Sequence, residues 1–100
     1  MRFAAKVDAN QAEIVKALRD AGCCVALTHV IGDGFPDLIA CKPFYPYELK
    51  LLEVKDGAKP PSARKLTPDQ EAFHAKWKGP IYVVKSVDEA LDVMGIVRKP

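Results

Sequence analysis

The stretch from residue 48 to residue 84 constrains the fold most, because it predicts two strands joined by a helix. Residues 48–55 form a β-type run, and residues 56–66 form a loop rich in Gly, Pro, Lys and Ser. Thr67-Pro68-Asp69-Gln70 then has the residues of a helix start: an N-cap Thr, a first-turn Pro and a Gln that can close a capping box. Gly79-Pro80 ends this helix before an apolar run at 81–84. A strand–helix–strand unit of this length joins parallel strands by a right-handed crossover.

The remaining patterns complete the order α-β-β-β-α-β-α. Residues 8–21 have helical spacing, with Asp8 or Asn10 as caps and Gly22 as the stop. Two β-type runs follow at 23–30 and 37–42, and a last helix spans 86–95. The 100 residues are enough for one domain. We therefore expect one α/β domain over 1–100, with a mixed four-stranded sheet flanked by helices on both faces.

Composition and cysteine usage limit the classes of protein to which the chain can belong. The chain has no apolar run of roughly 18 residues, which predicts no membrane span, and its first residues lack the apolar stretch of a signal peptide. Its three cysteines form no CxxC pair and have no matching histidine cluster, which favours buried free thiols over a disulfide framework or a zinc site. A cytoplasmic location is the resulting expectation.

Three charged residues stand out in the strands. Strand alternation places Glu53 and Lys55 on the same face as Leu49 and Leu51. Counting back from a Lys42–Glu48 pair in a simple hairpin places Asp37 directly opposite Glu53. Two carboxylates so close repel each other, and a divalent cation resolves that conflict. Lys55 on the same side can orient a hydroxide or offset charge on a phosphate. The alternative is an ordinary Glu–Lys pair on an exposed strand.

These residues carry a family resemblance. Pro36-Asp37 followed by Glu53-Val54-Lys55 resembles the motif of the PD-(D/E)XK nuclease superfamily. The residues Gly34-Phe35-Pro36-Asp37-Leu38 and Leu66-Thr67-Pro68-Asp69-Gln70 are similar to its VRR-NUC branch, the virus-type replication-repair nucleases, which are similar to Holliday junction resolvases. The resemblance covers about residues 10–94 in the same element order, with a restriction-endonuclease-like core.

The resemblance implies a site and an activity. Asp37 and Glu53 would hold Mg²⁺ or Mn²⁺, and Lys55 with Gln70 would position the attacking water. Glu13 matches the acid that commonly assists metal binding from the first helix, although it could equally face water. Gln70 could instead serve only as a helix cap. The implied function is a structure-selective DNA endonuclease that acts as a homodimer on branched DNA, in repair or recombination, with a phage origin as an expectation.

Other residues have more than one interpretation. Lys59, Arg64 and Lys65 in the 56–66 loop are candidates for contacting DNA phosphates, or simply a solvated basic face. His29 and His74 are expected to be structural or surface residues. The remaining ambiguous side chains are Asp33, a turn residue or a metal ligand, and the aromatic hairpin tip of Phe44, Tyr45 and Tyr47, which could stack on bases, form a subunit interface or pack locally.

Three rival functions remain open at this stage. The chain could be a non-catalytic DNA-binding module that keeps the nuclease fold, or a flap or single-strand nuclease. It could also be an unrelated α/β interaction protein in which residues 36–55 match by chance. The complete acid–acid–lysine set favours an enzyme over the first of these.

Overall fold

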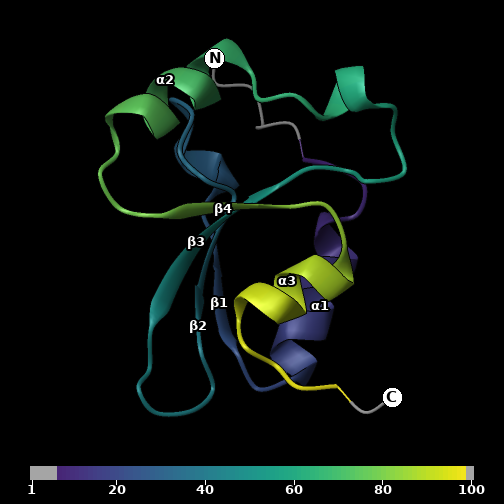
Figure 1. Cartoon of the computed structure of the whole chain (residues 1–100), viewed down its shortest axis with the longest axis vertical. Helices are drawn as coiled ribbons and strands as arrows, with labels where there is room; N and C mark the ends of the chain where they lie inside the picture. Colours follow the sequence, from purple (N-terminus) through teal and green to yellow (C-terminus); the bar gives the residue numbers. More distant parts are fainter. Residues whose placement is uncertain (1–6, 99–100) are drawn as a thin grey trace.

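A computed structural model describes residues 7–98 of the chain. Its helices are α1 (Gln11–Asp20), α2 (Pro68–Lys76) and α3 (Val87–Val93), with two short 3₁₀ turns, η1 (His29–Ile31) and η2 (Pro61–Arg64). Its strands are β1 (Cys24–Leu27), β2 (Leu38–Cys41), β3 (Leu49–Val54) and β4 (Ile81–Val84). The predicted order of helices and strands is confirmed (Figure 1).

The four strands form one sheet in the order β1-β2-β3-β4. β1 and β2 are antiparallel, β2 and β3 are antiparallel, and β3 and β4 are parallel, as the crossover predicts. Leu38 pairs with Leu52, and the Lys42 amide donates to the Glu48 carbonyl at 3.0 Å. The predicted mixed sheet and the predicted hairpin register are both confirmed.

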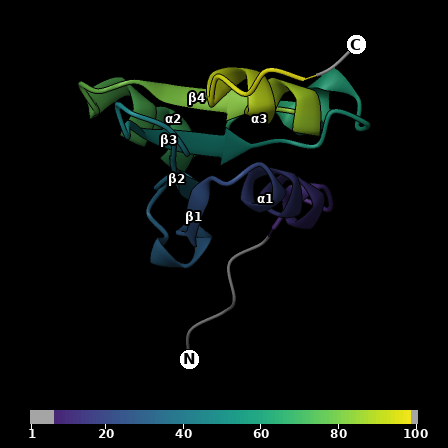
Figure 2. The same ribbon diagram turned by 90° about the horizontal axis from the view of Figure 1, so that it is seen from below.

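The main core lies between one face of the sheet and the helices α1 and α3, which contact each other on that side (Figure 2). Its fully buried side chains come from α1, β2, β3, β4 and the segment after α3; they include Ile14, Leu18, Leu38, Leu52, Val54, Val84 and Met94. This core explains why α1 keeps its predicted 3–4 apolar spacing. The backbone of Gly22, at φ +94°, then turns the chain from α1 into β1.

The opposite face of the sheet is only partly covered, which differs from the expectation of helices on both faces. α2 lies above β4 in the view of Figure 1, and its Gln70 bonds Glu53 near the end of β3. It is held there by Phe73 and Trp77, which stack on each other and meet Phe35 edge-on. Gly34, with φ +78°, permits this contact because a Cβ there would lie 2.2 Å from the Asp69 carbonyl oxygen.

Two differences from the sequence expectations concern local structure. The run at 23–30 is not one strand: β1 ends at Leu27, and η1 follows because the Ile31 amide donates to the Thr28 carbonyl. The 56–66 loop contains η2 rather than irregular chain throughout. No helix in residues 7–98 is long and apolar enough to cross a membrane. The prediction that the first residues lack a signal peptide concerns residues 1–6, which lie outside the described range.

Candidate functional site

The β2–β3 hairpin brings Asp37 and Glu53 together at one end of the sheet. The register that pairs Leu38 with Leu52 places Asp37 opposite Glu53 one step further along. Lys42 and Glu48 form a hydrogen-bonded pair, so by alternation Asp37 and Glu53 occupy a non-hydrogen-bonded position. Side chains are closest at such positions, with Cα atoms about 4.5 Å apart. The two acids therefore face one another, as the sequence predicts.

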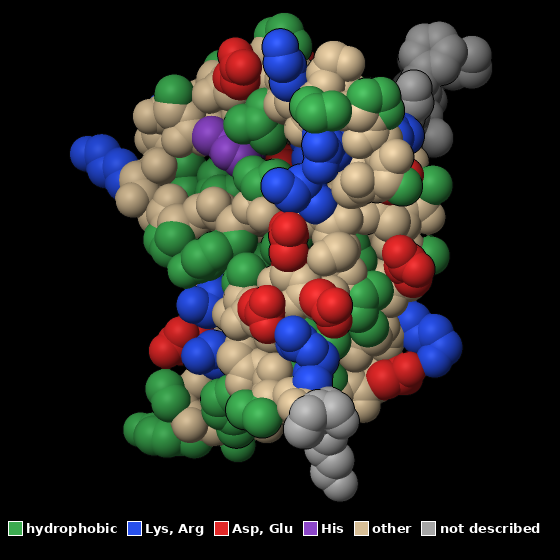
Figure 3. Space-filling model, turned by 45° about the vertical axis from the view of Figure 1, so that its right-hand side comes forward, with side chains coloured by type: hydrophobic (Ala, Val, Ile, Leu, Met, Phe, Trp, Pro, Cys, Tyr) green, Lys and Arg blue, Asp and Glu red, His purple; other side chains and the backbone are tan. Residues whose placement is uncertain are grey.

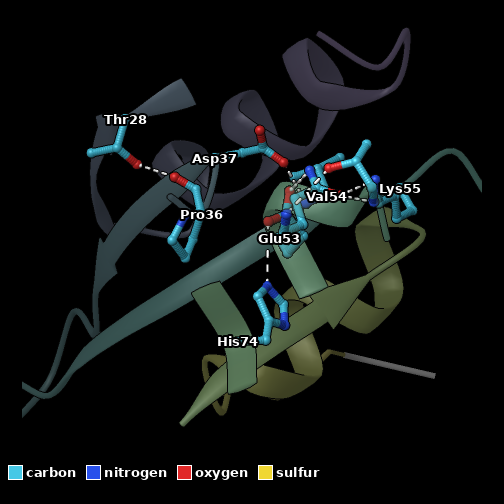
Figure 4. A network of polar contacts seen from close by, with 9 residues as sticks. Thr28, Pro36, Asp37, Glu53, Val54, Lys55 and His74 are labelled. Atoms are coloured by element: carbon cyan, nitrogen blue, oxygen red, sulfur yellow. Dashed lines mark hydrogen bonds and ion pairs between the residues drawn. The ribbon is translucent and has the colours of Figure 1, made fainter. Parts of the chain in front are cut away.

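Asp37 is fixed by backbone contacts on both sides. Its Oδ2 accepts a hydrogen bond from the Val54 amide at 2.8 Å, which ties it to the end of β3. Just before it, the Pro36 carbonyl accepts from the buried Thr28 hydroxyl at 2.8 Å. Figure 4 shows both contacts, with the Asp37 side chain directed toward the Glu53–Val54 segment. The carboxylate is thus held at the strand end without losing both of its oxygens to protein donors.

Glu53 is a fully buried acid, which is costly unless the charge is compensated. Burial first, and then hydrogen bonding and repulsion with Asp37, raise the pKa of Glu53 from 4.5 to about 9, against an opposing effect of Lys55. Without a cation the Asp37–Glu53 pair therefore keeps a proton at neutral pH. The two facing carboxyl groups therefore repel each other once both are ionised.

Gln70 links Glu53 to Lys55. Its Nε2 donates to Glu53 Oε2 at 3.0 Å, and its Oε1 accepts from Lys55 Nζ at 2.7 Å. The same Oε1 also accepts from the Thr67 amide at 2.9 Å, which completes the capping box of α2. Gln70 therefore caps the helix, as one interpretation predicted, and it also joins the acid to the lysine.

Lys55, Asp37 and Gln70 line a common hollow. Lys59 and Lys65 of the 56–66 loop also line it, together with Asp8 of the N-terminal segment. Lys59 Nζ lies 3.5 Å from Asp8 Oδ1. In Figure 3 Lys and Arg side chains lie close to acidic ones at the upper centre of the molecule, and further charged side chains lie in its lower half. The hollow thus combines carboxylate oxygens with Lys side chains, the residue type that contacts phosphate backbones.

The structure does not bring Glu13 and Arg64 to this hollow. Glu13 is exposed on α1, one position before the buried Ile14, and lines a separate hollow with Arg64, Asp56 and Glu89. The acid of the N-terminal segment that lines the same hollow as Asp37 is Asp8 instead. Asp33 sits in the turn with φ 55°, as a turn residue should. Among the described residues no three His, Cys, Asp or Glu side chains converge on one metal position.

Sequence reasoning missed two side chains at the site. His74, expected to be structural or surface, places Nε2 3.5 Å from Glu53 Oε1. Burial and then the charge of Lys55 lower the pKa of His74. Asn10 occupies the N-cap position of α1 but makes no side-chain cap; its Nδ2 donates to the Lys55 carbonyl at 3.0 Å and the Lys85 carbonyl at 3.2 Å. The spacing of His74 from Gln70, one helical turn, is the signal that could have revealed it.

Asn10 provides a stability prediction. Asn10→Ala removes the donor to two carbonyls at the ends of β3 and β4, and leaves a buried backbone acceptor unsatisfied. We expect the free energy of unfolding to fall by about 1–3 kcal/mol, measured by urea denaturation. Lys16→Ala, which breaks an exposed ion pair on the same helix, serves as the control and should leave the midpoint unchanged. An unchanged midpoint for Asn10→Ala would contradict the anchoring role.

The comparison with solved structures identifies the fold. A structure described as a VRR_NUC domain superposes with a TM-score of 0.59 and 20% sequence identity, covering 88% of this chain and 97% of that one. No protein-family model matches the sequence. No curated protein matches it either. The chain has the fold of a VRR_NUC domain, and the fold predicted by the resemblance is confirmed.

Proposed function

We propose that this chain is a metal-dependent nuclease that hydrolyses phosphodiester bonds of DNA. The observation that carries the proposal is the convergence of Asp37, Glu53, Lys55 and Gln70 at one end of the sheet, joined by hydrogen bonds. The VRR_NUC fold is consistent with it, because the nuclease in that name performs this class of reaction. The buried Glu53, whose pKa is raised, adds support, since acids with strongly shifted pKa values cluster at functional sites.

The donor set fits Mg²⁺ or Mn²⁺. Asp37 and Glu53 offer carboxylate oxygens, which hard divalent cations prefer, and such cations complete their shell with water and substrate phosphate. Glu53 Oε1 is buried and accepts no hydrogen bond within the described part of the chain, so it retains binding capacity. Asp8 replaces Glu13 as the proposed assisting acid, because it lines the same hollow. The bound cation would supply Lewis-acid activation of water and phosphate.

The other residues position the reactants. Lys55 Nζ donates to Gln70 Oε1, and in the proposed mechanism it orients the attacking water and balances the charge that develops on the phosphate. Gln70 keeps Lys55 and Glu53 in a fixed relation, so the charge of the lysine and the metal-binding carboxylate act at one point. Lys59 and Lys65, which line the hollow, would contact backbone phosphates next to the scissile bond, and such contacts fix position without reading sequence. We therefore expect selectivity for DNA shape, with branched DNA as the preferred substrate.

A direct assay tests this function. Labelled four-way junction, flap, single-stranded and linear duplex DNA are incubated with Mg²⁺ or Mn²⁺ and the wild type or Asp37→Ala. The proposal expects metal-dependent cleavage by the wild type that Asp37→Ala abolishes. Binding without cleavage by the wild type identifies a non-catalytic module, and neither binding nor cleavage identifies a chance match. Flap or single strands cleaved in preference to junctions would reassign the substrate.

We further propose that the nuclease is a homodimer through the open face of its sheet. The register aligns two rows of side chains across that face, one of Cys24, Cys41 and Leu49 and one of Ala26, Ile39, Leu51 and Ile81. Leu49 is 71% exposed, and the exposed hairpin tip of Phe44, Tyr45 and Tyr47 adjoins it. All side chains of the two rows are uncharged. The same face of a second copy can therefore pack against this one without like-charge repulsion. Of the interpretations of the tip, this proposal adopts the subunit interface.

Sedimentation velocity tests the dimer. We expect the wild type to sediment as a dimer at micromolar concentration and Leu49→Glu to sediment as a folded monomer, since the variant places two buried charges at the interface. Val97→Glu is the matched control, because Val97 is 94% exposed and lies near the C-terminus. A wild type that remains monomeric with and without DNA would contradict the proposal.

A further inference from the structure

His74 faces Glu53, the acid at the centre of the site, and is not among the residues that line the hollow. It follows Gln70 by one turn of α2, so both side chains leave the same face of the helix. Gln70 binds Glu53 Oε2, while His74 Nε2 lies 3.5 Å from Glu53 Oε1. Figure 4 shows the imidazole directed at Glu53. Two side chains of one helix thus lie next to the two oxygens of the same carboxylate.

The two facing atoms each lack a hydrogen-bond partner. Glu53 Oε1 and His74 Nε2 are both buried, and within residues 7–98 neither makes a hydrogen bond. A buried polar atom without a partner is destabilising, and these two atoms lie 3.5 Å apart. An imidazole with its proton on Nε2 is a donor. A small closing movement from 3.5 Å reaches the hydrogen-bond range of about 2.7–3.2 Å.

We propose that His74 is a positioning residue that donates from Nε2 to Glu53 Oε1 and orients this carboxylate for the metal. The inference rests on the proposed function, in which Glu53 is a metal ligand. His74 and Gln70 then act as a pair: each donates to one oxygen of Glu53, so the carboxylate cannot rotate. Partners that orient a metal ligand in this way commonly change metal affinity or activity by about 10–100-fold when removed.

Two substitutions separate hydrogen bonding from packing. His74→Phe keeps a planar ring under α2 but removes the donor, whereas His74→Gln keeps an N–H donor at a similar reach. We expect His74→Phe to weaken Mn²⁺ binding about 10-fold or more by calorimetry and to lower kcat with KM for DNA little changed. His74→Gln should recover most of both. His29→Phe is the matched control, since His29 contacts Gln11 rather than the site.

A spectroscopic measurement reads the contact without any assay of activity. The chain contains two histidines, so long-range ¹H–¹⁵N spectra in Mg²⁺ show two imidazoles that the Phe variants assign. We expect His74 to be the Nε2–H tautomer. The Nδ1–H tautomer would overturn the inference even if His74→Phe failed to fold.

Two results separate the inference from the function on which it rests. A wild type that binds Mn²⁺ and cleaves DNA, beside a His74→Phe variant that does both equally well, overturns the role of His74 alone. Weak binding by both His74→Phe and His74→Gln, with both folded, would show that the ring matters for packing instead. A wild type that neither binds Mn²⁺ nor cleaves overturns the proposed function together with the positioning role.

Discussion

Glu53→Gln is expected to abolish DNA cleavage and, at the same time, to make the metal-free protein more stable. Cleavage is lost because the amide cannot supply the negative charge that holds the cation. Stability rises because Glu53 has no exposed surface and the amide removes the cost of a buried acid. We expect a gain of roughly 2 kcal/mol at pH 7, which for a domain of this size raises Tm by on the order of 10 °C.

The same substitution should remove a pH dependence. The pKa of Glu53 is raised in the folded protein from 4.5 to about 9, so between these values the folded state binds more protons than the unfolded state. The contribution of Glu53 to stability is therefore fully present below pH 4.5 and is lost as pH rises toward 9. Thermal unfolding in EDTA across this range should show the decline in the wild type and a flatter profile in Glu53→Gln. Equal profiles would contradict the buried-acid assignment.

Metal ions should reverse the loss of stability that occurs as pH rises. Because the protonated pair must release its proton when a cation binds, Mn²⁺ affinity should increase with pH and binding should release protons into the buffer. Glu89→Gln is a matched control: Glu89 is an acid whose Oε1 accepts from the Lys85 amide, and it lies outside the proposed site. Its Mn²⁺ affinity should equal that of the wild type.

Lys55→Met is expected to lower kcat for DNA cleavage by about 10²–10³-fold, the usual cost of removing one preorganised donor from an active site. Met has a similar length and no charge, so the space under Gln70 stays filled. Mn²⁺ binding should persist, because Lys55 contacts Gln70 rather than a metal ligand and its positive charge opposes a second cation. Single-turnover cleavage and calorimetry measure the two effects separately.

Lys50→Met provides the matched control for Lys55. It changes the same residue type in the same strand, but Lys50 lies beyond the site, where its Nζ is 3.4 Å from the Tyr82 hydroxyl. Its cleavage rate should match the wild type. Loss of Mn²⁺ binding in Lys55→Met would show that Lys55 supports the metal site itself, and an unchanged kcat would remove it from the mechanism.

The β2–β3 hairpin shows why much of the site could be predicted. A short connection between two antiparallel strands sets the register, and the register sets which side chains face each other. Asp37 and Glu53 followed from that rule with no tertiary information. The start of α2 followed equally well, because the capping box of Thr67 and Gln70 is a local interaction.

Contacts between distant segments could not be predicted in this way. Asn10 has the residue type of a helix cap, yet its side chain bonds the ends of β3 and β4, which lie 45 and 75 residues away. Glu13 matched a family position, but the burial of Ile14 turns it to a different hollow, and Asp8 reaches the site instead. The open sheet face likewise depends on where α2 docks.

Local rules were therefore enough for the order of elements, the mixed sheet and the facing of Asp37 and Glu53, since turn length, strand alternation and helix caps act over a few residues. The docking of α2 through Phe35, Phe73 and Trp77 required the folded chain. That docking brings Gln70 and His74 to the two oxygens of Glu53 and buries it. Burial and proximity between distant segments control the pKa of an acid, and a local sequence pattern determines neither of them.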